Sequence, residues 1–575
     1  MTAYTPDPAT FVLDANLASS KQRTQPGKRA EAQRHARAIS PLRLWLLGLG
    51  FFALFGAIGA KIVWLAVIAE ARGPVEVIEY KLDVGADEHR RSPVVDRNGR
   101  VLADNVYRSA AYANPSKIQD VDGTLAGLAQ IFPDMDIEAL GRRLRDRNKS
   151  FVYVQRGLTP QQEEAVWNLG EPGLEFLSEQ HRVYPKGNLT AHVVGFNDID
   201  TAGLAGIEAY FDRSLQQGVA PLELSIDVGI QHVVAEELAA AVEYFEAPAG
   251  AAVMLDARTS EVLALVSLPD YDPYNPAAQS QAQLRNRATY ETYELGSVFK
   301  VFTLAAAIES GAVRLDEQID VSQPLKISRF TIKDFHRHNG TMDPQTILSE
   351  SSNIGSAKLA LRVGNKTQKA FMRSLGLLTS SQVEVQEVSA PSYPSNWGKT
   401  HTATISYGHG IATSPLQVAN AFAAIVNGGM YRPATLVKRD ADDSLYDGTR
   451  VISERTSKIM RDMLGYVVQE GTGGKADAKG YRVGGKTGTA DKPRGGSYNE
   501  DARIATFLGA FPIEDPQYVL LVMVDEPLPQ EDTYGYATGG WVAAPAFKKI
   551  VERTAPMLGL EQILPPEEGD AEAGQ

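Results

Sequence analysis

The stretch Glu294-Leu295-Gly296-Ser297-Val298-Phe299-Lys300 decides how the chain is interpreted, because its Ser-x-x-Lys tetrad opens an apolar segment that continues to Ile308. Gly296 suits a turn, and Ser297 suits the first positions of a helix, where backbone N–H groups lack partners. Side chains three residues apart share one helical face, with Cβ atoms about 5–6 Å apart. The Ser297 hydroxyl and the Lys300 amine are therefore within hydrogen-bond reach. A neutral amine would make this serine an activated nucleophile on a buried helix.

The tetrad alone is weak evidence, since a chain of this length contains on the order of one by chance. Its alternative interpretation is a capping serine followed by a solvated lysine. Ser351-Ser352-Asn353 is expected in a turn between helices at residues 343–350 and 354–362. Lys486-Thr487-Gly488-Thr489 lies on a strand candidate, and its glycine would let a ligand backbone approach closely. Together, in this order, the three motifs resemble the set of a known group of serine acyl-transfer enzymes, and this resemblance favours an enzyme.

Attack on an amide requires a nucleophile, a base, an oxyanion site and groups that bind the substrate. Lys300 is the candidate base, provided that its pKa falls by about three units from its ordinary value near 10.4. Burial and the second cation, Lys486, both act in that direction. The other expected roles are a proton relay at Ser351, orientation of a substrate amide and of Lys300 by Asn353, carboxylate binding by Lys486, Thr487 and Thr489, and an oxyanion hole from the backbone N–H groups of Ser297 and Thr489.

The composition argues against several other functions. The 575 residues allow two or three domains, and the net charge of -13 predicts no nucleic-acid partner. The lack of cysteine excludes disulfides, thiolate metal sites and a cysteine nucleophile. His336, His338 and His409 have no third ligand at a suitable spacing, so structural or solvated histidines are expected. We predict no metal and no cofactor.

The N-terminal part predicts a membrane anchor. Residues 1–43 are polar and basic, which indicates a disordered cytoplasmic tail. Residues 44–69 are apolar except for Lys61, and Trp45 and Trp64 lie roughly 28 Å apart along a helix, which matches the hydrocarbon thickness. A cleaved signal peptide is the alternative, although its apolar region would be shorter. We expect a single transmembrane helix, with the rest of the chain outside the cytoplasm.

Two bodies and a tail follow the anchor. Residues 70–220 mix short strands and helices without a catalytic constellation, which predicts an elongated non-catalytic α/β module; within it, residues 96–100 are expected to turn a hairpin. Residues 221–560 begin and end with strands around a helical middle, which predicts an α+β domain whose antiparallel sheet carries helices on its faces. Residues 561–575 are acidic and predict a flexible tail. The expected elements of the second body are helices at 227–244 and 543–557 and strands at 251–256, 261–266, 482–490, 503–511 and 518–524.

With these motifs in view, the chain resembles the class B penicillin-binding proteins over roughly residues 90 to 550. Besides the three motifs, the resemblance rests on Asp96-Arg97-Asn98-Gly99 and the Gly-Leu-x-Gly-x-Glu pattern of residues 203–208 in the first body. In the second body it rests on Arg285-Asn286-Arg287-Ala288, on Tyr407-Gly408-His409-Gly410 and on residues 413–417. Leu295 stands where many members have proline, which leaves the chemistry intact but puts the stiffness of the turn in doubt.

The resemblance implies a penicillin-binding-protein/serine β-lactamase-like transpeptidase fold behind a pedestal or dimerisation-type domain. It implies a D,D-transpeptidase of septal peptidoglycan synthesis, which forms a Ser297 acyl-enzyme from the D-Ala-D-Ala end of one stem peptide and transfers it to the amine of another. It also implies inhibition by β-lactams. The expected partners are a membrane-embedded SEDS-family glycosyltransferase and other divisome proteins, at the septum in the bacterial inner membrane with a periplasmic catalytic domain.

Three alternatives remain open at this point. An elongation-specific class B transpeptidase would carry the same motifs. A D,D-carboxypeptidase or β-lactamase would use water as the acceptor, although an anchored first body argues against a free β-lactamase. A catalytically silent divisome scaffold would not require the intact serines and lysines.

Overall fold

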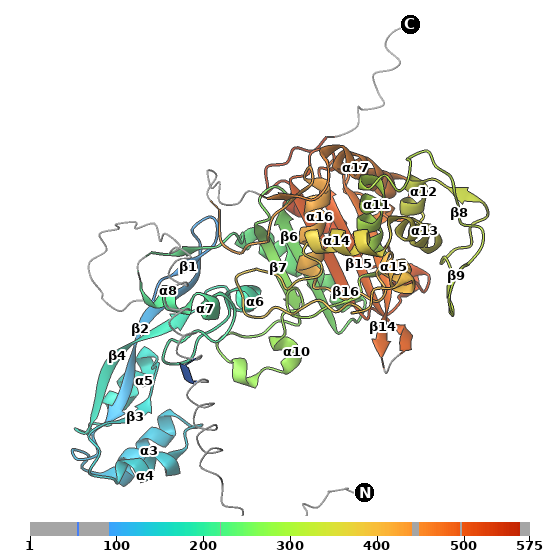
Figure 1. Ribbon diagram of the computed structural model, residues 1–575. Coiled ribbons are helices and arrows are strands. Elements are labelled where there is room, and N and C mark those ends of the chain that lie inside the picture. The colour runs from blue at the N-terminus through green and yellow to red at the C-terminus, as the bar shows by residue number, and fades with distance from the viewer. Residues whose placement is uncertain (1–54, 57–90, 219, 440–447, 495–496, 564–575) are drawn as a thin grey trace, which may run out of the picture. The chain divides into compact units, whose positions relative to one another are not determined.

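The computed structural model describes residues 55–56, 91–218, 220–439, 448–494 and 497–563 (Figure 1). The expected tail at 1–43, all but two residues of the expected membrane helix at 44–69, and most of the tail at 561–575 lie outside this range. None of the helices within the described ranges is long and apolar enough to cross a bilayer. The chain divides into the units Met1–Lys81 and Leu82–Gln575, and everything from Arg91 onward belongs to the second.

Residues 91–223 are built around a sheet in the order β3-β2-β1-β5, with β4 also paired to β2. The predicted hairpin is confirmed, since the Asp96 carboxylate accepts hydrogen bonds from the backbone N–H groups of Asn98 and Arg100 between β1 and β2. Helices α3, α4 and α5 pack on this sheet through an apolar cluster of their own. The elements are β1 (Val94–Val95), β2 (Val101–Ala113), β3 (Val152–Gln155), β4 (Leu174–Val183), β5 (Leu222–Glu223), α3 (Val121–Ile131), α4 (Ile137–Leu144) and α5 (Pro160–Trp167).

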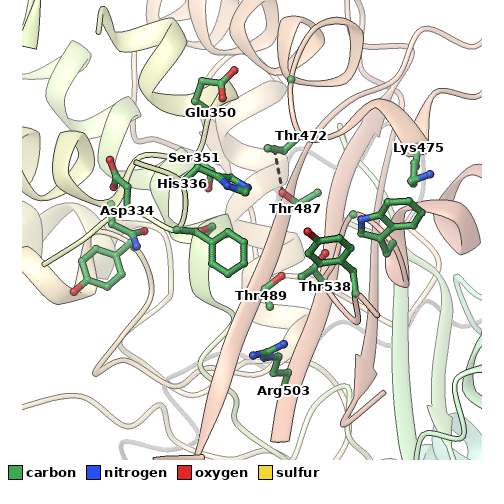
Figure 2. A pocket seen from close by; sticks show the side chains of 18 of the residues that line it. Asp334, His336, Glu350, Ser351, Thr472, Lys475, Thr487, Thr489, Arg503 and Thr538 are labelled. Atoms are coloured by element: carbon green, nitrogen blue, oxygen red, sulfur yellow. Dashed lines mark hydrogen bonds between the residues drawn. The ribbon is translucent and has the colours of Figure 1, made fainter. Parts of the chain in front are cut away.

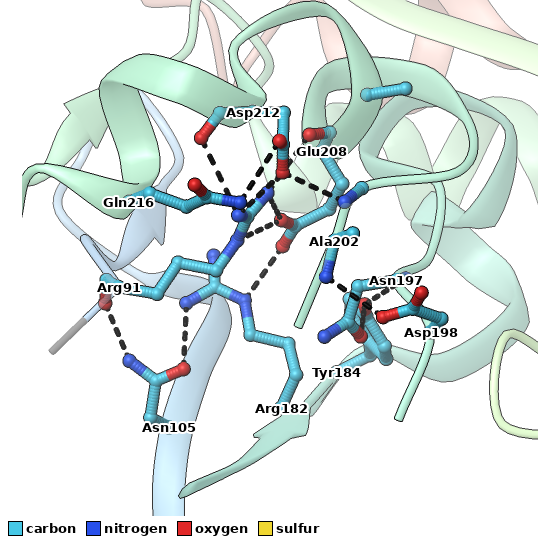
Figure 3. A network of polar contacts seen from close by, with 12 residues as sticks. Arg91, Asn105, Arg182, Tyr184, Asn197, Asp198, Ala202, Glu208, Asp212 and Gln216 are labelled. Carbon is cyan, nitrogen blue, oxygen red and sulfur yellow. Dashed lines mark hydrogen bonds and ion pairs between the residues drawn. The ribbon is translucent and has the colours of Figure 1, made fainter. Parts of the chain in front are cut away.

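Glu208, the last residue of the Gly-Leu-x-Gly-x-Glu pattern, is fully buried on the short helix α7 (Gly206–Tyr210). Its two carboxylate oxygens lie 2.6 Å from Arg91 Nη2 and 2.7 Å from Arg182 Nε of β4. Arg91 also pairs with Asp212 at 2.7 Å, and its carbonyl accepts a hydrogen bond from the Asn105 side chain (Figure 3). A buried carboxylate requires such partners, so this residue holds the sheet and α7 together.

Residues from Val228 onward form a second sheet, antiparallel and five-stranded, in the order β14-β15-β16-β6-β7. On β6, Ala251 and Val253 belong to one apolar cluster, together with α11 and α16, whereas Ala252 and Met254 belong to another, together with α9 and α18. Successive strand residues point to opposite faces, so helices cover both faces and the predicted α+β architecture is confirmed. The elements are β6 (Ala249–Asp256), β7 (Val262–Leu268), β14 (Gly484–Arg494), β15 (Ser497–Phe511), β16 (Tyr518–Asp525), α9 (Val228–Tyr244), α11 (Phe299–Glu309), α16 (Pro415–Val426) and α18 (Ala543–Thr554).

The segment between the two groups of strands is mainly helical, as predicted. The sequence did not predict two short strand pairs that lie between α11 and α12, β8 (Ile319–Asp320) with β11 (Thr341–Met342) and β9 (Leu325–Ile327) with β10 (Phe330–Ile332). Strands of two or three residues are too short to show a period. The helices of this segment are α12 (Pro344–Ser349), α13 (Asn353–Val363), α14 (Asn365–Ser374), α15 (Lys399–Ile405) and α17 (Glu454–Gln469).

Candidate active site

Ser297 lies on a 3-10 turn (Gly296–Val298) that leads directly into α11. Gly296 has φ +60°, and a Cβ at this position would lie 2.5 Å from the Thr489 carbonyl oxygen of β14. A Cβ at Gly488 would lie 2.5 Å from the Leu295 carbonyl oxygen. The two glycines therefore let the nucleophile turn pack against β14 backbone to backbone. The nucleophile turn occupies the space on the Cβ side of Gly488. The expectation that this glycine also lets a ligand backbone approach stays a prediction.

Lys300 joins the nucleophile to the second motif. Its Nζ lies 3.0 Å from Ser297 Oγ and 2.9 Å from Ser351 Oγ, and it donates to the Ser351 carbonyl oxygen. The side chain is only 1% exposed. Burial, with a further contribution from the positive charge of Lys486, holds the pKa of Lys300 well below its ordinary value, while the negative charge of Asp334 acts in the opposite direction. Both effects expected from the sequence are confirmed.

Lys486 is fully buried behind the pocket wall. Its Nζ donates to Thr487 Oγ1 at 3.1 Å and to the Thr487 carbonyl oxygen at 3.2 Å. Burial lowers its pKa to about 7. Thr487 and Thr489 line the pocket. Binding of a substrate carboxylate by Lys486 stays a prediction; the amine donates to the Thr487 hydroxyl, through which its charge can reach a ligand.

The second motif lies in the predicted turn between α12 and α13. Ser351 has φ +59°, a left-handed conformation that is uncommon outside glycine. Ser352 caps α13, with its Oγ accepting a hydrogen bond from Gly355 N at 2.9 Å. The Asn353 amide nitrogen donates to the Lys333 carbonyl oxygen at 3.0 Å, and no hydrogen bond within the described ranges joins it to Lys300. The expected hold of Asn353 on Lys300 is therefore not seen, whereas its position at the pocket leaves it able to meet a substrate.

An open cavity of about 810 Å³ brings the motifs together (Figure 2). Its size suits a peptide-sized ligand. The residues of the three motifs that line it are Ser297, Ser351, Asn353, Thr487 and Thr489.

Two family models match this chain. The model of the penicillin binding protein transpeptidase domain matches residues 250–552, and the model of the penicillin-binding protein dimerisation domain matches residues 87–223. The chain is a class B penicillin-binding protein.

The relatives of this penicillin-binding protein agree with that assignment. It is 37% identical over 488 residues to the probable peptidoglycan D,D-transpeptidase FtsI of Caulobacter vibrioides. The aligned segment covers 83% of this chain and 82% of the relative. It is 31% identical over 575 residues to the peptidoglycan D,D-transpeptidase FtsI of Escherichia coli, covering 94% and 95% of the two chains. A crystal structure of penicillin binding protein 3 from Mycobacterium tuberculosis, complexed with aztreonam, matches with a TM-score of 0.66 at 27% identity, over 83% of this chain and 98% of that one.

One wall of the pocket in this penicillin-binding protein comes from the loop after α15. Gly408 has φ +83°, and a Cβ there would lie 2.2 Å from the Gly296 carbonyl oxygen, so this loop supports the nucleophile turn from behind. His409 lines the pocket and stacks on Tyr498, with ring centroids 5.0 Å apart. The Tyr498 hydroxyl donates to Glu294 at 3.0 Å. The Tyr407-Gly408-His409-Gly410 motif of this loop was one basis of the resemblance. For His409 itself, a structural or solvated role was expected.

Sequence reasoning missed the wall beyond β14. Trp541 stacks in parallel on Tyr536 at 6.0 Å, and Lys475 Nζ lies 3.8 Å from the centre of a Trp541 ring. Thr489 Oγ1 accepts a hydrogen bond from Gly539 N at 3.0 Å, which fixes this loop against the strand. Tyr536 and Trp541 belong to a loop and Lys475 to a three-residue 3-10 turn, where neither period nor motif marks them. Further lining residues outside the motifs are Asp334, Phe335, His336, His338, Glu350, Tyr407 and Arg503.

Proposed function

We propose that this protein is a peptidoglycan D,D-transpeptidase of cell division, with Ser297 as the nucleophile. The observation that carries the proposal is the contact of Lys300 Nζ with both Ser297 Oγ and Ser351 Oγ at the cavity wall. The same activity is printed in the names of the Caulobacter and Escherichia coli relatives. The membership in class B is in keeping with it.

Acylation follows from these contacts. Neutral Lys300 takes the proton of Ser297, and Oγ attacks the carbonyl carbon between the two D-alanines. The backbone N–H groups of Ser297 and Thr489 stabilise the oxyanion that forms. The C–N bond then breaks, the leaving D-alanine amine receives the proton through the Ser351 hydroxyl, and an ester remains on Ser297. In the second half the acceptor amine attacks this ester, its proton returns through the same groups, and Ser297 is released with the new amide formed.

Binding of the donor peptide uses the opposite wall. The hydroxyls of Thr487 and Thr489 face the cavity and suit the terminal carboxylate, and Lys486 supports this by polarising the Thr487 hydroxyl at 3.1 Å. Asn353 orients the substrate amide from the other side. Lys486 has a second effect, because its charge lowers the pKa of Lys300 and so increases the fraction of neutral base.

The cellular setting belongs to the same proposal. Residues 44–69 anchor the chain in the inner membrane, with residues 1–43 in the cytoplasm, a pedestal at 70–220 and the periplasmic catalytic domain at 221–560. A SEDS-family glycosyltransferase and divisome proteins are the partners.

β-Lactams acylate Ser297; the Mycobacterium tuberculosis relative is complexed with aztreonam in one structure and with ampicillin in another. Division is distinguished from elongation by whether a fluorescent fusion gathers at mid-cell or along the side wall.

The test of this function compares fluorescent penicillin labelling of the membrane-bound full chain with that of Ser297→Ala. The matched control is Ser310→Ala, because Ser310 lies at the other end of α11 and its hydroxyl donates to backbone carbonyls of that helix. We expect labelling of the parent and the control but not of Ser297→Ala. Labelling of Ser297→Ala would overturn the nucleophile. Analysis of the products from stem peptides then separates cross-linked dimers from the trimmed monomers that a carboxypeptidase would release.

A further inference from the structure

Asp334 lies on the loop between β10 and β11, outside all three motifs, and lines the cavity (Figure 2). Its Oδ2 accepts a hydrogen bond from Ser352 Oγ at 2.8 Å, and its Oδ1 accepts one from Ile354 N at 2.9 Å. The neighbouring Lys333 carbonyl accepts a bond from the Asn353 amide. Three consecutive residues at the start of α13 are thus tied to two consecutive residues of this loop.

These contacts complete the beginning of α13. Ser352 is fully buried, and a buried hydroxyl requires partners. The Ser352 oxygen accepts a hydrogen bond from Gly355 N at the N-cap of the helix, and its O–H donates to Asp334. The hydroxyl is therefore paired both as an acceptor and as a donor. A carboxylate at the first turn of a helix is also favoured by the helix dipole. Asp334 therefore acts as a second cap that is supplied from a distant part of the chain.

The capped turn carries Ser351. Its left-handed conformation, φ +59°, persists in proteins only where the surroundings hold it. Its peptide neighbour on the C-terminal side is Ser352, the residue that Asp334 fixes. Both the carbonyl and the hydroxyl of Ser351 accept from Lys300 Nζ. A chain of direct contacts therefore leads from Asp334 through Ser352 and Ser351 to the amine of Lys300.

We propose that Asp334 is a positioning residue that sets the Ser351 turn for proton transfer with Lys300. This inference rests on the proposed role of Lys300 as the base for Ser297. The charged groups that face Lys300 are Lys486 on β14, Asp334 and, when protonated, His409. The carboxylate opposes Lys486 in its effect on the Lys300 pKa, so Asp334 has an electrostatic effect in addition to its geometric one.

A purely structural cap is the plainer explanation, and Asp343 provides the matched control. Asp343 caps the neighbouring helix α12, where its carboxylate accepts from Thr346 N at 2.7 Å, and no hydrogen bond among the described residues joins its side chain to the Ser351 turn. Asp343→Ala removes a cap of the same kind at a helix start that carries none of the three motifs. A role limited to helix stability would give Asp334→Ala and Asp343→Ala the same behaviour.

The experiment measures the second-order acylation rate of the full chain, solubilised in detergent, with a chromogenic cephalosporin from acidic to alkaline pH. We expect Asp334→Ala to lose about tenfold or more, the size of one charged hydrogen bond, and Asp343→Ala to retain the parental rate. Asp334→Asn keeps an acceptor for Ile354 N but removes the charge. Its acid limb is expected to move to lower pH, because the pKa of Lys300 falls further when the carboxylate is lost.

Equal rates for Asp334→Ala and Asp343→Ala would overturn the proposal, as would an acid limb of Asp334→Asn that coincides with the parental one. If Asp334→Ala fails to fold in a thermal melt, the pH profile of Asp334→Asn decides alone. Failure of the proposed function gives a different result, because Ser297→Ala would then still be acylated whatever the Asp334 variants do.

Discussion

Gly488→Ala tests whether the third motif keeps its glycine for the nucleophile turn or for a ligand. The added Cβ would lie 2.5 Å from the Leu295 carbonyl oxygen and 3.1 Å from Val298 Cγ1. The first of these is a backbone atom, so a side-chain rotation cannot relieve the overlap. Such overpacking costs about 1–3 kcal/mol. The shift is about 2–4 °C for each kcal/mol in a domain of 150–250 residues and smaller in a larger domain such as this one, so the melting temperature should fall by a few degrees.

The same overlap displaces Ser297 relative to β14. A misplacement of about 1 Å can cost on the order of a hundredfold in rate, so the acylation rate of Gly488→Ala should fall by at least tenfold. Gly465→Ala is the control. Gly465 is on α17, and a Cβ there would meet Ile513 Cγ2 at 3.6 Å, an ordinary contact. Alanine is favoured over glycine inside a helix by about 1 kcal/mol, so this variant should melt at or above the parental temperature and acylate normally.

The assay pairs a thermal melt with the kinetics of β-lactam acylation on the same preparations. An unchanged melting temperature with weaker β-lactam binding would refute the reasoning, because the glycine would then serve the ligand. Parental values of both quantities would show that the turn does not depend on this close contact.

Three further predictions concern charge. Lys486→Met removes a positive charge that lowers the pKa of Lys300, so this pKa should rise. The acid limb of the pH profile of acylation should therefore move to higher pH. A shift to lower pH would contradict the electrostatic role of Lys486. Glu208→Gln leaves Arg182 buried without its carboxylate and leaves Arg91 with Asp212 alone. It should destabilise the protein by about 3–5 kcal/mol in denaturant unfolding; a loss below about 1 kcal/mol would show that solvent or other partners replace the lost carboxylate. Burial lowers the pKa of His192 from 6.5 to about 4. Between these two pH values the unfolded state therefore binds more protons than the folded state. As the pH falls through this window, His192 alone should lower the free energy of unfolding by about 1.4 kcal/mol per pH unit. His192→Asn should therefore lose less stability between pH 7 and pH 4 than the parent, and equal losses would exclude this source.

Regular elements with a strong pattern were predictable from the sequence. β6 and β16 are short, nearly continuous apolar runs, which is typical of strands buried on both faces, and α9 begins at its capping Asp227. The approach of Lys300 to Ser297 was also predictable, because the two residues are three positions apart on a 3-10 turn that continues directly into α11. The contact of Lys300 with Ser351 required the recognised order of motifs, since 51 residues separate the pair.

Features that depend on packing between distant segments were not predictable. The purpose of Gly488 depends on which backbone lies against β14, and the direction of Lys486 depends on what fills the space behind the strand. Asp334 caps a helix from an irregular loop 20 residues before Ile354, and neither spacing nor period marks such a contact. The pocket wall of Trp541 and Lys475 likewise forms only when a loop meets a short 3-10 turn from another part of the chain.

The central claim is that Lys300 activates Ser297 for attack on an amide. Its most direct test is mass spectrometry of proteolytic peptides from the full chain after reaction with penicillin. The account predicts one penicilloyl adduct, carried by the peptide that contains Ser297, and none on that peptide after Lys300→Met. An adduct on another serine, or undiminished acylation of Ser297 in Lys300→Met, would contradict it.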